Sequence, residues 1–479
     1  MSIAAPTTMM TLAQAAQWLS NARLIGDPET AIFRVHSDTR TVEAGDLFVA
    51  LEGDKFNANH FLHDAKRLGA SAVLCRSGLS VEMYPEGLAR IEVEDTKIAL
   101  GELAAGWRSQ FVLPLIAVTG SNGKTTVTQM LASILNTHAP GGAALATQGN
   151  LNNDIGVPLT LLRMRSKHRI AVVELGMNHP GEIAQLTAWA APTVGMVNNA
   201  QREHQEFMQS VEAVALENGA VFQALSEDGW AVFPASDAHQ SIWRSMAAQH
   251  HVMDFGSDAA AVKVLQADWQ TNHWQLRLQT PQGEVACSLQ LAGLHNVHNA
   301  MAACASAMAA GAPLQAITQG LSSFEAVSGR SRSMPLQTEG HNYTLIDDTY
   351  NANPDSVRAA IDLLAQSQGP RLLVLGDMGE VGEQGPQFHQ EVGAYAKSCG
   401  VDQLFTLGEL CRHSAQAFNG AQHFDNMDTM QRQVISKVKH MATVLVKGSR
   451  FMRMERVVQA LQAAHPTAAT LPHKEASCC

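Results

Sequence analysis

Apolar runs too short to form helices alternate with amphipathic stretches through the middle of the chain. The apolar runs that predict buried strands are Leu113–Val118, Ile170–Val173 and Val194–Val197. Helical spacing of apolar residues is found at 98–110 and 126–136. Short apolar strands separated by helices are typical of a parallel sheet with both faces covered. We therefore predict a central α/β domain over residues 96–330, built on a parallel sheet.

The pattern changes between Val262 and Leu291, where apolar and polar residues alternate with period two. Turn chemistry at Thr280-Pro281-Gln282-Gly283 divides this stretch, so we predict an antiparallel insert of hairpins. The alanine-rich stretch Asn296–Ala310 then returns to helical composition.

A second set of strands and helices follows residue 330. Strands are predicted at Thr344–Ile346, Leu372–Leu375, Leu404–Leu407 and Thr443–Val446. Helices are predicted at Asp355–Ala365, Gln387–Lys397, Leu410–Phe418 and Met454–Ala463. This alternation predicts a Rossmann-like C-terminal domain over residues 331–479.

The N-terminal 95 residues show fewer such signals. Strands at Leu47–Leu51 and Ser71–Cys75 flank a helix at Phe61–Leu68, which predicts a small α/β domain over residues 1–95. Three domains also fit a chain of 479 residues, since domains commonly span about 100–200 residues.

Composition excludes several classes of protein. The net charge of −11 argues against a general nucleic-acid binder. No run of 18 apolar residues appears, and Met1–Met10 lacks the features of a signal peptide. The seven cysteines are scattered without a Cys-x-x-Cys pair. We therefore expect a protein of the reducing cytoplasm without integral membrane contact.

The strongest local signal is the junction between a predicted strand and a predicted helix at residues 119–126, here called the phosphate loop. It reads Thr119-Gly120-Ser121-Asn122-Gly123-Lys124-Thr125-Thr126. Backbone N–H groups at a helix N-terminus bind anions, and glycines allow close approach. Val118 stands where the first glycine of the usual motif would fall. The alternative explanation is a Gly-Lys turn that precedes a helix by chance. The loop predicts nucleotide binding without distinguishing kinase, hydrolase or ligase.

Polar residues follow the next two predicted strands. Glu174 ends one strand, where a carboxylate would face the ligand crevice and suit Mg²⁺, although a surface carboxylate explains it equally well. His204 follows the other strand and would enter the same crevice, but a lone histidine is more often structural. Asn299 could recognise a base edge, whereas Asn296 fits simple helix capping.

The C-terminal segment offers two further clusters after strands. Asp347-Asp348 leads into a turn rich in Asn and Pro, and turn chemistry alone does not explain adjacent aspartates. Lys447-Gly448-Ser449-Arg450 supplies cations and an N-terminal anion site, or is merely a basic loop.

Taken together, these residues resemble the Mur ligase family, in order, up to about Ala464. The resemblance implies that ATP is bound by Gly120, Ser121, Asn122, Gly123, Lys124, Thr125, Thr126, Asn299, Arg330 and Asp348. It implies that Thr125, Glu174 and His204 hold Mg²⁺, and that Lys124, Glu174, His204 and Arg330 are catalytic.

Other segments are similar to the substrate-binding motifs of one branch of the family. They include Ser37-Asp38-Thr39-Arg40 and Gly149-Asn150-Leu151-Asn152-Asn153. The UDP-substrate residues that this implies are Ser37, Thr39, Arg40 and Asn150, and the residues for C-terminal substrate contact or closure are Asn351, Asn353, Lys447 and Ser449.

The resemblance implies ligation of D-alanyl-D-alanine to UDP-N-acetylmuramoyl-tripeptide through an acyl phosphate, with ATP and Mg²⁺, for the cell wall. A sister ligase, a folylpolyglutamate synthase-like ligase and an ATPase without ligation remain alternatives. We expect a monomer whose third domain moves about a hinge near Gly329–Ser333. Many family members carry a carbamylated lysine that helps to hold a second Mg²⁺, but Asn218 stands at its place. The carbamate is therefore not carried over to this chain.

Overall fold

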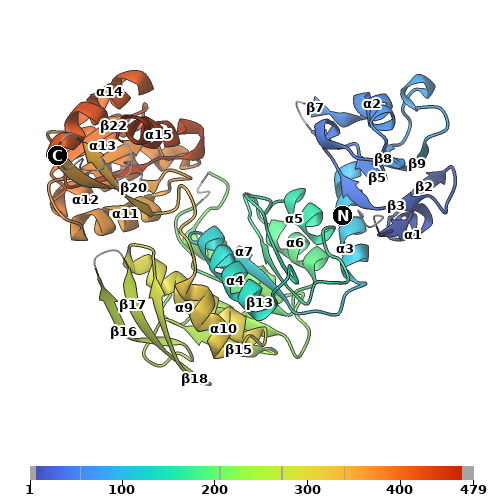
Figure 1. The fold of residues 1–479 in the computed structure, drawn as a ribbon, viewed down its shortest axis with the longest axis horizontal. Coiled ribbons are helices and arrows are strands. Elements are labelled where there is room, and N and C mark those ends of the chain that lie inside the picture. Colours follow the sequence, from blue (N-terminus) through green and yellow to red (C-terminus); the bar gives the residue numbers. More distant parts are fainter. Residues whose placement is uncertain (1–6, 54–55, 204–205, 271–272, 339, 466–479) are drawn as a thin grey trace, which may run out of the picture.

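Three α/β units lie along an arc, with the N-terminal and C-terminal units at opposite ends of the central one (Figure 1). The structure is a computed structural model and describes residues 7–53, 56–203, 206–270, 273–338 and 340–465. His204 lies outside these described residues. Within them, no helix is both long enough and apolar enough to cross a membrane.

The N-terminal unit is built on a five-stranded sheet. Its strands, in spatial order, are β2 (Arg23–Ile25), β9 (Ala89–Val93), β8 (Ala72–Arg76), β5 (Asp46–Val49) and β4 (Arg34–His36). All neighbours are parallel except β2 and β9. Helix α2 (Leu62–Arg67) covers one face, while α1 (Leu12–Gln17) and α3 (Thr96–Arg108) share the core of the other. The predicted strands and helix near 47–75 are confirmed.

Helix α3 joins the N-terminal unit to the central one. A Cβ added at Gly106 would lie 2.1 Å from the Trp18 ring, and one added at Gly101 would lie 2.2 Å from the Trp189 ring. The Nε of Arg108 donates to the Ala190 carbonyl over 3.0 Å. Because both sides of α3 are packed so closely, these two units share one continuous core. The boundary at residues 95 and 96, like that at 330, remains a prediction.

The central unit contains a six-stranded sheet whose neighbours are all parallel. In spatial order the strands are β11 (Ala144–Ala146), β12 (Ile170–Glu174), β10 (Leu115–Thr119), β13 (Val194–Val197), β14 (Trp230–Pro234) and β15 (His251–Phe255). One face carries α4 (Lys124–His138), α9 (Leu294–Ala309) and α10 (Leu314–Ser322). The other carries α5 (Gly156–Leu161), α6 (Glu182–Ala190), α7 (Val211–Gly219) and α8 (Gln240–Met246). Burial on both faces explains the unbroken apolar runs.

The predicted antiparallel insert is confirmed as a three-stranded sheet, β16 (Lys263–Trp269), β17 (Trp274–Thr280) and β18 (Gly283–Leu289). Residues of β17 and β18 alternate between buried and more exposed positions, as period two requires. The buried side packs into the same core as α9 and α10.

The C-terminal unit contains a second six-stranded sheet. Its order is β19 (Arg332–Thr338), β20 (His341–Asp348), β24 (Thr443–Lys447), β21 (Arg371–Gly376), β22 (Gln403–Leu407) and β23 (Gln422–Phe424). Only β19 is antiparallel to its neighbour. Helices α11 (Pro354–Gln366), α12 (Gly385–Ser398) and α13 (Cys411–Phe418) cover one face, and α14 (Met427–Lys437) and α15 (Glu455–Ala464) the other. The four predicted strands are confirmed, and β19, β23 and α14 are additional.

Candidate functional site

The phosphate loop joins β10 to α4, and its two glycines adopt conformations that other residues rarely take. Gly120 has φ 125° and Gly123, the N-cap of α4, has φ 84°. A Cβ at Gly123 would lie 2.4 Å from Asn299 Oδ1 and 2.5 Å from Asn198 Nδ2. Only glycine therefore fits here, and α4 begins at Lys124 rather than at the predicted Thr126.

Asparagine side chains hold the phosphate loop in place through hydrogen bonds to its backbone. The Asn122 N–H donates to Asn199 Oδ1 over 2.8 Å, and Asn198 Nδ2 donates to the Asn122 carbonyl over 2.7 Å. The Gly120 N–H donates to Asn218 Oδ1 over 2.7 Å. These contacts within the protein fix the shape of the loop.

Asn218 is a support of the loop and does not line the cavity described below. It is 1% exposed, and its Nδ2 donates to the Val214 carbonyl over 3.0 Å. Both ends of its amide are therefore engaged by the backbone. This arrangement does not fit a residue that presents a metal ligand.

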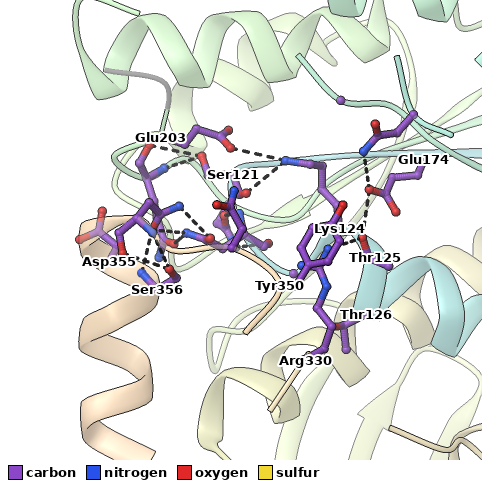
Figure 2. Close-up of a pocket in the computed structure, with 18 of the residues that line it drawn as sticks. Ser121, Lys124, Thr125, Thr126, Glu174, Glu203, Arg330, Tyr350, Asp355 and Ser356 are labelled. Carbon is purple, nitrogen blue, oxygen red and sulfur yellow. Dashed lines mark hydrogen bonds and ion pairs between the residues drawn. The ribbon is translucent and has the colours of Figure 1, made fainter. Parts of the chain in front are cut away.

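Lys124 lies across the loop with 15% of its side chain exposed. Its ammonium donates to the carbonyl oxygens of Gly120 and Ser121 and lies 3.5 Å from Glu203 Oε2. Figure 2 shows this side chain between the Glu203 side of the cavity and the Thr125–Glu174 side. A cation in this position can reach an anion bound at the helix N-terminus.

Glu174 ends β12 and contacts the first turn of α4. Its Oε1 accepts from Thr125 Oγ1 over 3.1 Å and from Asn152 Nδ2 over 2.8 Å. Its Oε2 is buried without a hydrogen-bond partner among the described residues. An unpaired buried carboxylate oxygen is costly. Together with the Thr125 hydroxyl it forms the hard oxygen donor set that Mg²⁺ prefers, so the residues fit this ion.

Arg330 enters the cavity from the connection to the C-terminal unit. Its guanidinium donates to Thr125 Oγ1 over 2.9 Å and lies 3.8 Å from the centre of the Tyr350 ring. The preceding Gly329 has φ 76°, and its N–H donates to Asp347 Oδ2 over 2.9 Å. The first aspartate of the pair therefore fixes the connection from which Arg330 reaches the phosphate loop. Figure 2 shows Arg330 near Tyr350 and Thr125.

The second aspartate forms a buried ion pair. Lys447 Nζ donates to Asp348 Oδ2 over 2.6 Å and to the Asn351 carbonyl over 2.9 Å. The Ser331 N–H donates to Asp348 Oδ1 over 3.0 Å. Burial acts to raise the pKa of Asp348, but the Lys447 ammonium, His295 and the Ser331 N–H together outweigh it and the pKa is lowered. The carboxylate is therefore charged at neutral pH.

Asn353 links the C-terminal unit to the phosphate loop. It caps α11 by accepting from the Ser356 N–H over 2.8 Å. Its Nδ2 also donates to Asn122 Oδ1 over 2.9 Å. Ser449 has a different task, since its Oγ accepts from the Gly379 N–H over 2.6 Å and so holds a neighbouring loop.

That neighbouring loop, residues 377–380, begins at Asp377. The Asp377 carboxylate forms a buried cluster with His389 and Cys411, whose possible ligand atoms lie within 4.8 Å of one another. His389 Nε2 lies 3.0 Å from the Met378 N–H, and its Nδ1 lies 2.7 Å from the Gly385 carbonyl. Backbone groups thus engage both ring nitrogens. The cluster supports the loop whose Gly379 and Glu380 line the cavity.

These groups surround a cavity of about 830 Å³ between the central and C-terminal units. The predicted site residues that line it are Ser121, Asn122, Gly123, Lys124, Thr125, Thr126, Asn150, Glu174, Asn299, Arg330, Asp348, Asn351, Asn353 and Lys447. Gly120 and Ser449 do not line the cavity but hold residues that do. Sequence reasoning missed Tyr350 as a partner of Arg330, since its sequence context only indicated a turn.

Three predicted substrate residues are not brought to this cavity. Ser37, Thr39 and Arg40 belong to the N-terminal unit and lie outside the lining. Arg40 is exposed and pairs with Asp38 over 2.6 Å. The side-chain hydrogen bond from Arg40 lowers the pKa of Asp38 to about 2.

The capping interpretation of Asn296 is wrong. Gly293 is the N-cap of α9, and Asn296 lies inside the helix, where its Nδ2 donates to the Ala292 carbonyl over 2.7 Å. Asn299 Nδ2 donates to Asn296 Oδ1 over 2.9 Å, and Asn299 Oδ1 accepts from Asn198 over 2.9 Å. Asn296 and Asn299 therefore connect helix α9 to the asparagine that holds the phosphate loop.

Comparison with known proteins extends over nearly the whole chain. Family models described as Mur ligase family, catalytic domain, Mur ligase middle domain, and Mur ligase, glutamate ligase domain match residues 32–108, 118–307 and 332–450. The UDP-N-acetylmuramoyl-tripeptide–D-alanyl-D-alanine ligase of Escherichia coli (strain K12) is 40% identical over 89% of this chain and 93% of its own length. The enzyme of the same name from Haemophilus influenzae is 39% identical over 94% and 97%.

Solved structures agree. A crystal structure of MurF from Acinetobacter baumannii has a TM-score of 0.87 at 33% identity, covering 95% of this chain and 98% of that one. A folylpolyglutamate synthase of Mycobacterium tuberculosis, at 17% identity and a TM-score of 0.63, shares the fold alone. The relatives, the family models and the three-unit architecture agree: the chain belongs to the Mur ligase family.

Proposed function

We propose that this protein joins the amino group of D-alanyl-D-alanine to the terminal carboxylate of UDP-N-acetylmuramoyl-tripeptide, converting ATP to ADP and phosphate. The observation that carries the proposal is the 40% identity, over 93% of its length, to a relative named for this reaction. The cavity supports it, because a phosphate loop, a hard-cation donor set and cationic side chains converge there.

Phosphoryl transfer depends mainly on positioning and on neutralising charge. In the first step the tripeptide carboxylate oxygen bonds to the γ-phosphorus and the bond to ADP breaks, which yields an acyl phosphate. The N–H groups of the first turn of α4 would orient the phosphates, since those of Gly120, Ser121 and Asn122 already donate within the protein. Lys124 and Arg330 would neutralise the charge that builds up on the transferring group.

In the second step the free amine attacks the acyl carbon, the carbon–oxygen bond to phosphate breaks, and the amine loses a proton. Water must be kept away, because an acyl phosphate hydrolyses readily. Residues of the C-terminal unit, Asn351 and Lys447 among them, line the same cavity as the phosphate loop and would help to exclude it.

Thr125 and Glu174 would hold Mg²⁺, which supplies positive charge to the phosphates when bound. The unpaired Oε2 of Glu174 supports this assignment. Ser37, Thr39, Arg40 and Asn150 would bind the UDP substrate. We also propose that the chain works as a monomer in the cytoplasm, and light scattering from the purified protein would test the first of these points.

Phosphate release by the purified protein tests the reaction. With Mg-ATP and the UDP-linked tripeptide, we expect release only when D-alanyl-D-alanine is added, together with a product heavier by the dipeptide less water. D-glutamate or lysine in place of the dipeptide serves as the control for a sister ligase. ATP hydrolysis that ignores both substrates would refute the proposal.

A further inference from the structure

Arg202 spans the boundary between the central and C-terminal units, although it does not line the cavity. Its backbone N–H donates to Asp355 Oδ2 over 2.8 Å. Its guanidinium donates to Asp355 Oδ1 over 2.6 Å and to Glu391 Oε2 over 2.8 Å. The guanidinium also lies 5.3 Å from the centre of the Phe388 ring. One side chain thus contacts the first turn of α11 and the middle of α12.

The same segment is fastened to the phosphate loop. The Gln201 N–H donates to Ser121 Oγ over 2.9 Å, and Asn122 Nδ2 donates to Gln201 Oε1 over 2.6 Å. Ser121 Oγ in turn donates to the Gln201 carbonyl over 3.3 Å. Successive residues therefore connect the loop on one side and the C-terminal helices on the other.

The charges at this contact are arranged favourably. Asp355 lies in the first turn of α11, where the helix dipole stabilises a carboxylate. Glu391 receives a second cation, since Arg358 donates to its Oε1 over 2.9 Å. The Arg202 side chain is 23% exposed and engages both carboxylates through paired donors. Such charge-assisted, bidentate contacts are stronger than ordinary surface ion pairs.

We propose that Arg202 is a positioning residue that docks the C-terminal unit onto the phosphate loop, and this inference rests on the proposed function. Because Arg330, Asn351 and Lys447 reach the cavity from beyond the connection at Gly329, the distance between them and Lys124 depends on how the two units dock. The Arg202 ion pairs hold that docking together with the Asn353–Asn122 hydrogen bond, so Arg202 acts on the reaction through the arrangement of other residues.

The test compares Arg202→Gln with Arg358→Gln. Both remove a cation from Glu391, but only Arg202 crosses between the units, so Arg358→Gln is the matched control. Small-angle scattering of the full chain with Mg²⁺ and a non-hydrolysable ATP analogue should show a larger radius of gyration for Arg202→Gln alone. In steady-state kinetics we expect kcat to fall about tenfold in this variant, with ATP affinity by calorimetry changed less than twofold.

Glu391→Gln removes the C-terminal partner of the same contact. It should raise the radius of gyration and lower kcat by smaller amounts than Arg202→Gln. The double variant Arg202→Gln/Glu391→Gln should be no worse than Arg202→Gln, because the two residues share one contact. Equal scattering and equal kcat in Arg202→Gln and the unaltered protein, or equal losses in Arg358→Gln, would overturn the proposal. Scattering is independent of catalysis, so failure of the ligation assay would count against the proposed function and not against the docking role.

Discussion

Replacing Asn218 with leucine should loosen the phosphate loop from beneath. Leucine is close to asparagine in size but offers no acceptor to the Gly120 N–H, which now donates over 2.7 Å at a site 1% exposed. The Val214 carbonyl loses the hydrogen bond from Asn218 Nδ2 but keeps the backbone hydrogen bond of the α-helix. The main cost is one buried donor left unpaired, about 1–3 kcal/mol.

That free energy also bounds the effect on nucleotide binding. If the whole cost falls on the shape of the loop, the Kd for ATP should rise by about fivefold to 140-fold, since 1.4 kcal/mol is a factor of ten. Calorimetric titration with ATP measures this rise, and thermal unfolding with and without ATP measures the loss of stability.

Trp243→Phe is the control for Asn218→Leu. The Trp243 indole donates to the Ala215 carbonyl over 2.8 Å, so the change removes a buried hydrogen bond to the same helix α7 without touching the loop. We expect a comparable loss of stability with an unaltered Kd. The reasoning fails if Asn218→Leu binds ATP as tightly as the unaltered protein, or if Trp243→Phe weakens binding equally.

Three further outcomes are expected. Glu174→Gln should raise the Mg²⁺ concentration for half-maximal activity by about ten- to a hundredfold, measured by Mg²⁺ titration of phosphate release, and an unchanged requirement would remove this residue from the cation site. Hydrogen bonds from Arg202 lower the pKa of Glu391 below its ordinary 4.5, so its stabilising contribution is present above that value and is lost as the pH falls through the lowered pKa. Scattering across an acid titration should therefore show undocking in acid only, and a transition near neutral pH would contradict it. Cys399 is the only half-buried free cysteine among the described ones, and burial raises the pKa of Cys75 to about 12, so peptide mapping after alkylation should find Cys399 modified before the other four described cysteines; equal labelling of Cys75 would refute this.

Local sequence was sufficient to predict the strands that end at the site. Strands such as Val194–Val197 are buried on both faces, and their apolar runs record that burial directly. The phosphate loop was predictable because glycine and lysine are required by local backbone geometry and anion chemistry. The strand β19 escaped prediction because it is an edge strand containing Pro335, and only pairing with β20 identifies it.

Asn296 illustrates where local reasoning failed. A capping preference depends on the residues nearby, but the amide of Asn296 bonds to Ala292 and Asn299 inside the turn that supports the phosphate loop. Similarly, nothing around Asn218 indicates that its side chain meets Gly120, which is 98 residues away along the chain.

By itself, the sequence determined the three α/β units, the buried strands at their centres, and a nucleotide loop followed by polar residues at strand ends. It could do so because burial periodicity and loop chemistry are properties of neighbouring residues. Tertiary structure alone decided that Arg202 meets Asp355, 153 residues further on, and that Arg330 stacks on Tyr350 beside Thr125. Contacts of this kind depend on how two separately folded surfaces dock, and a charged residue has the same sequence pattern whether it faces water or a partner.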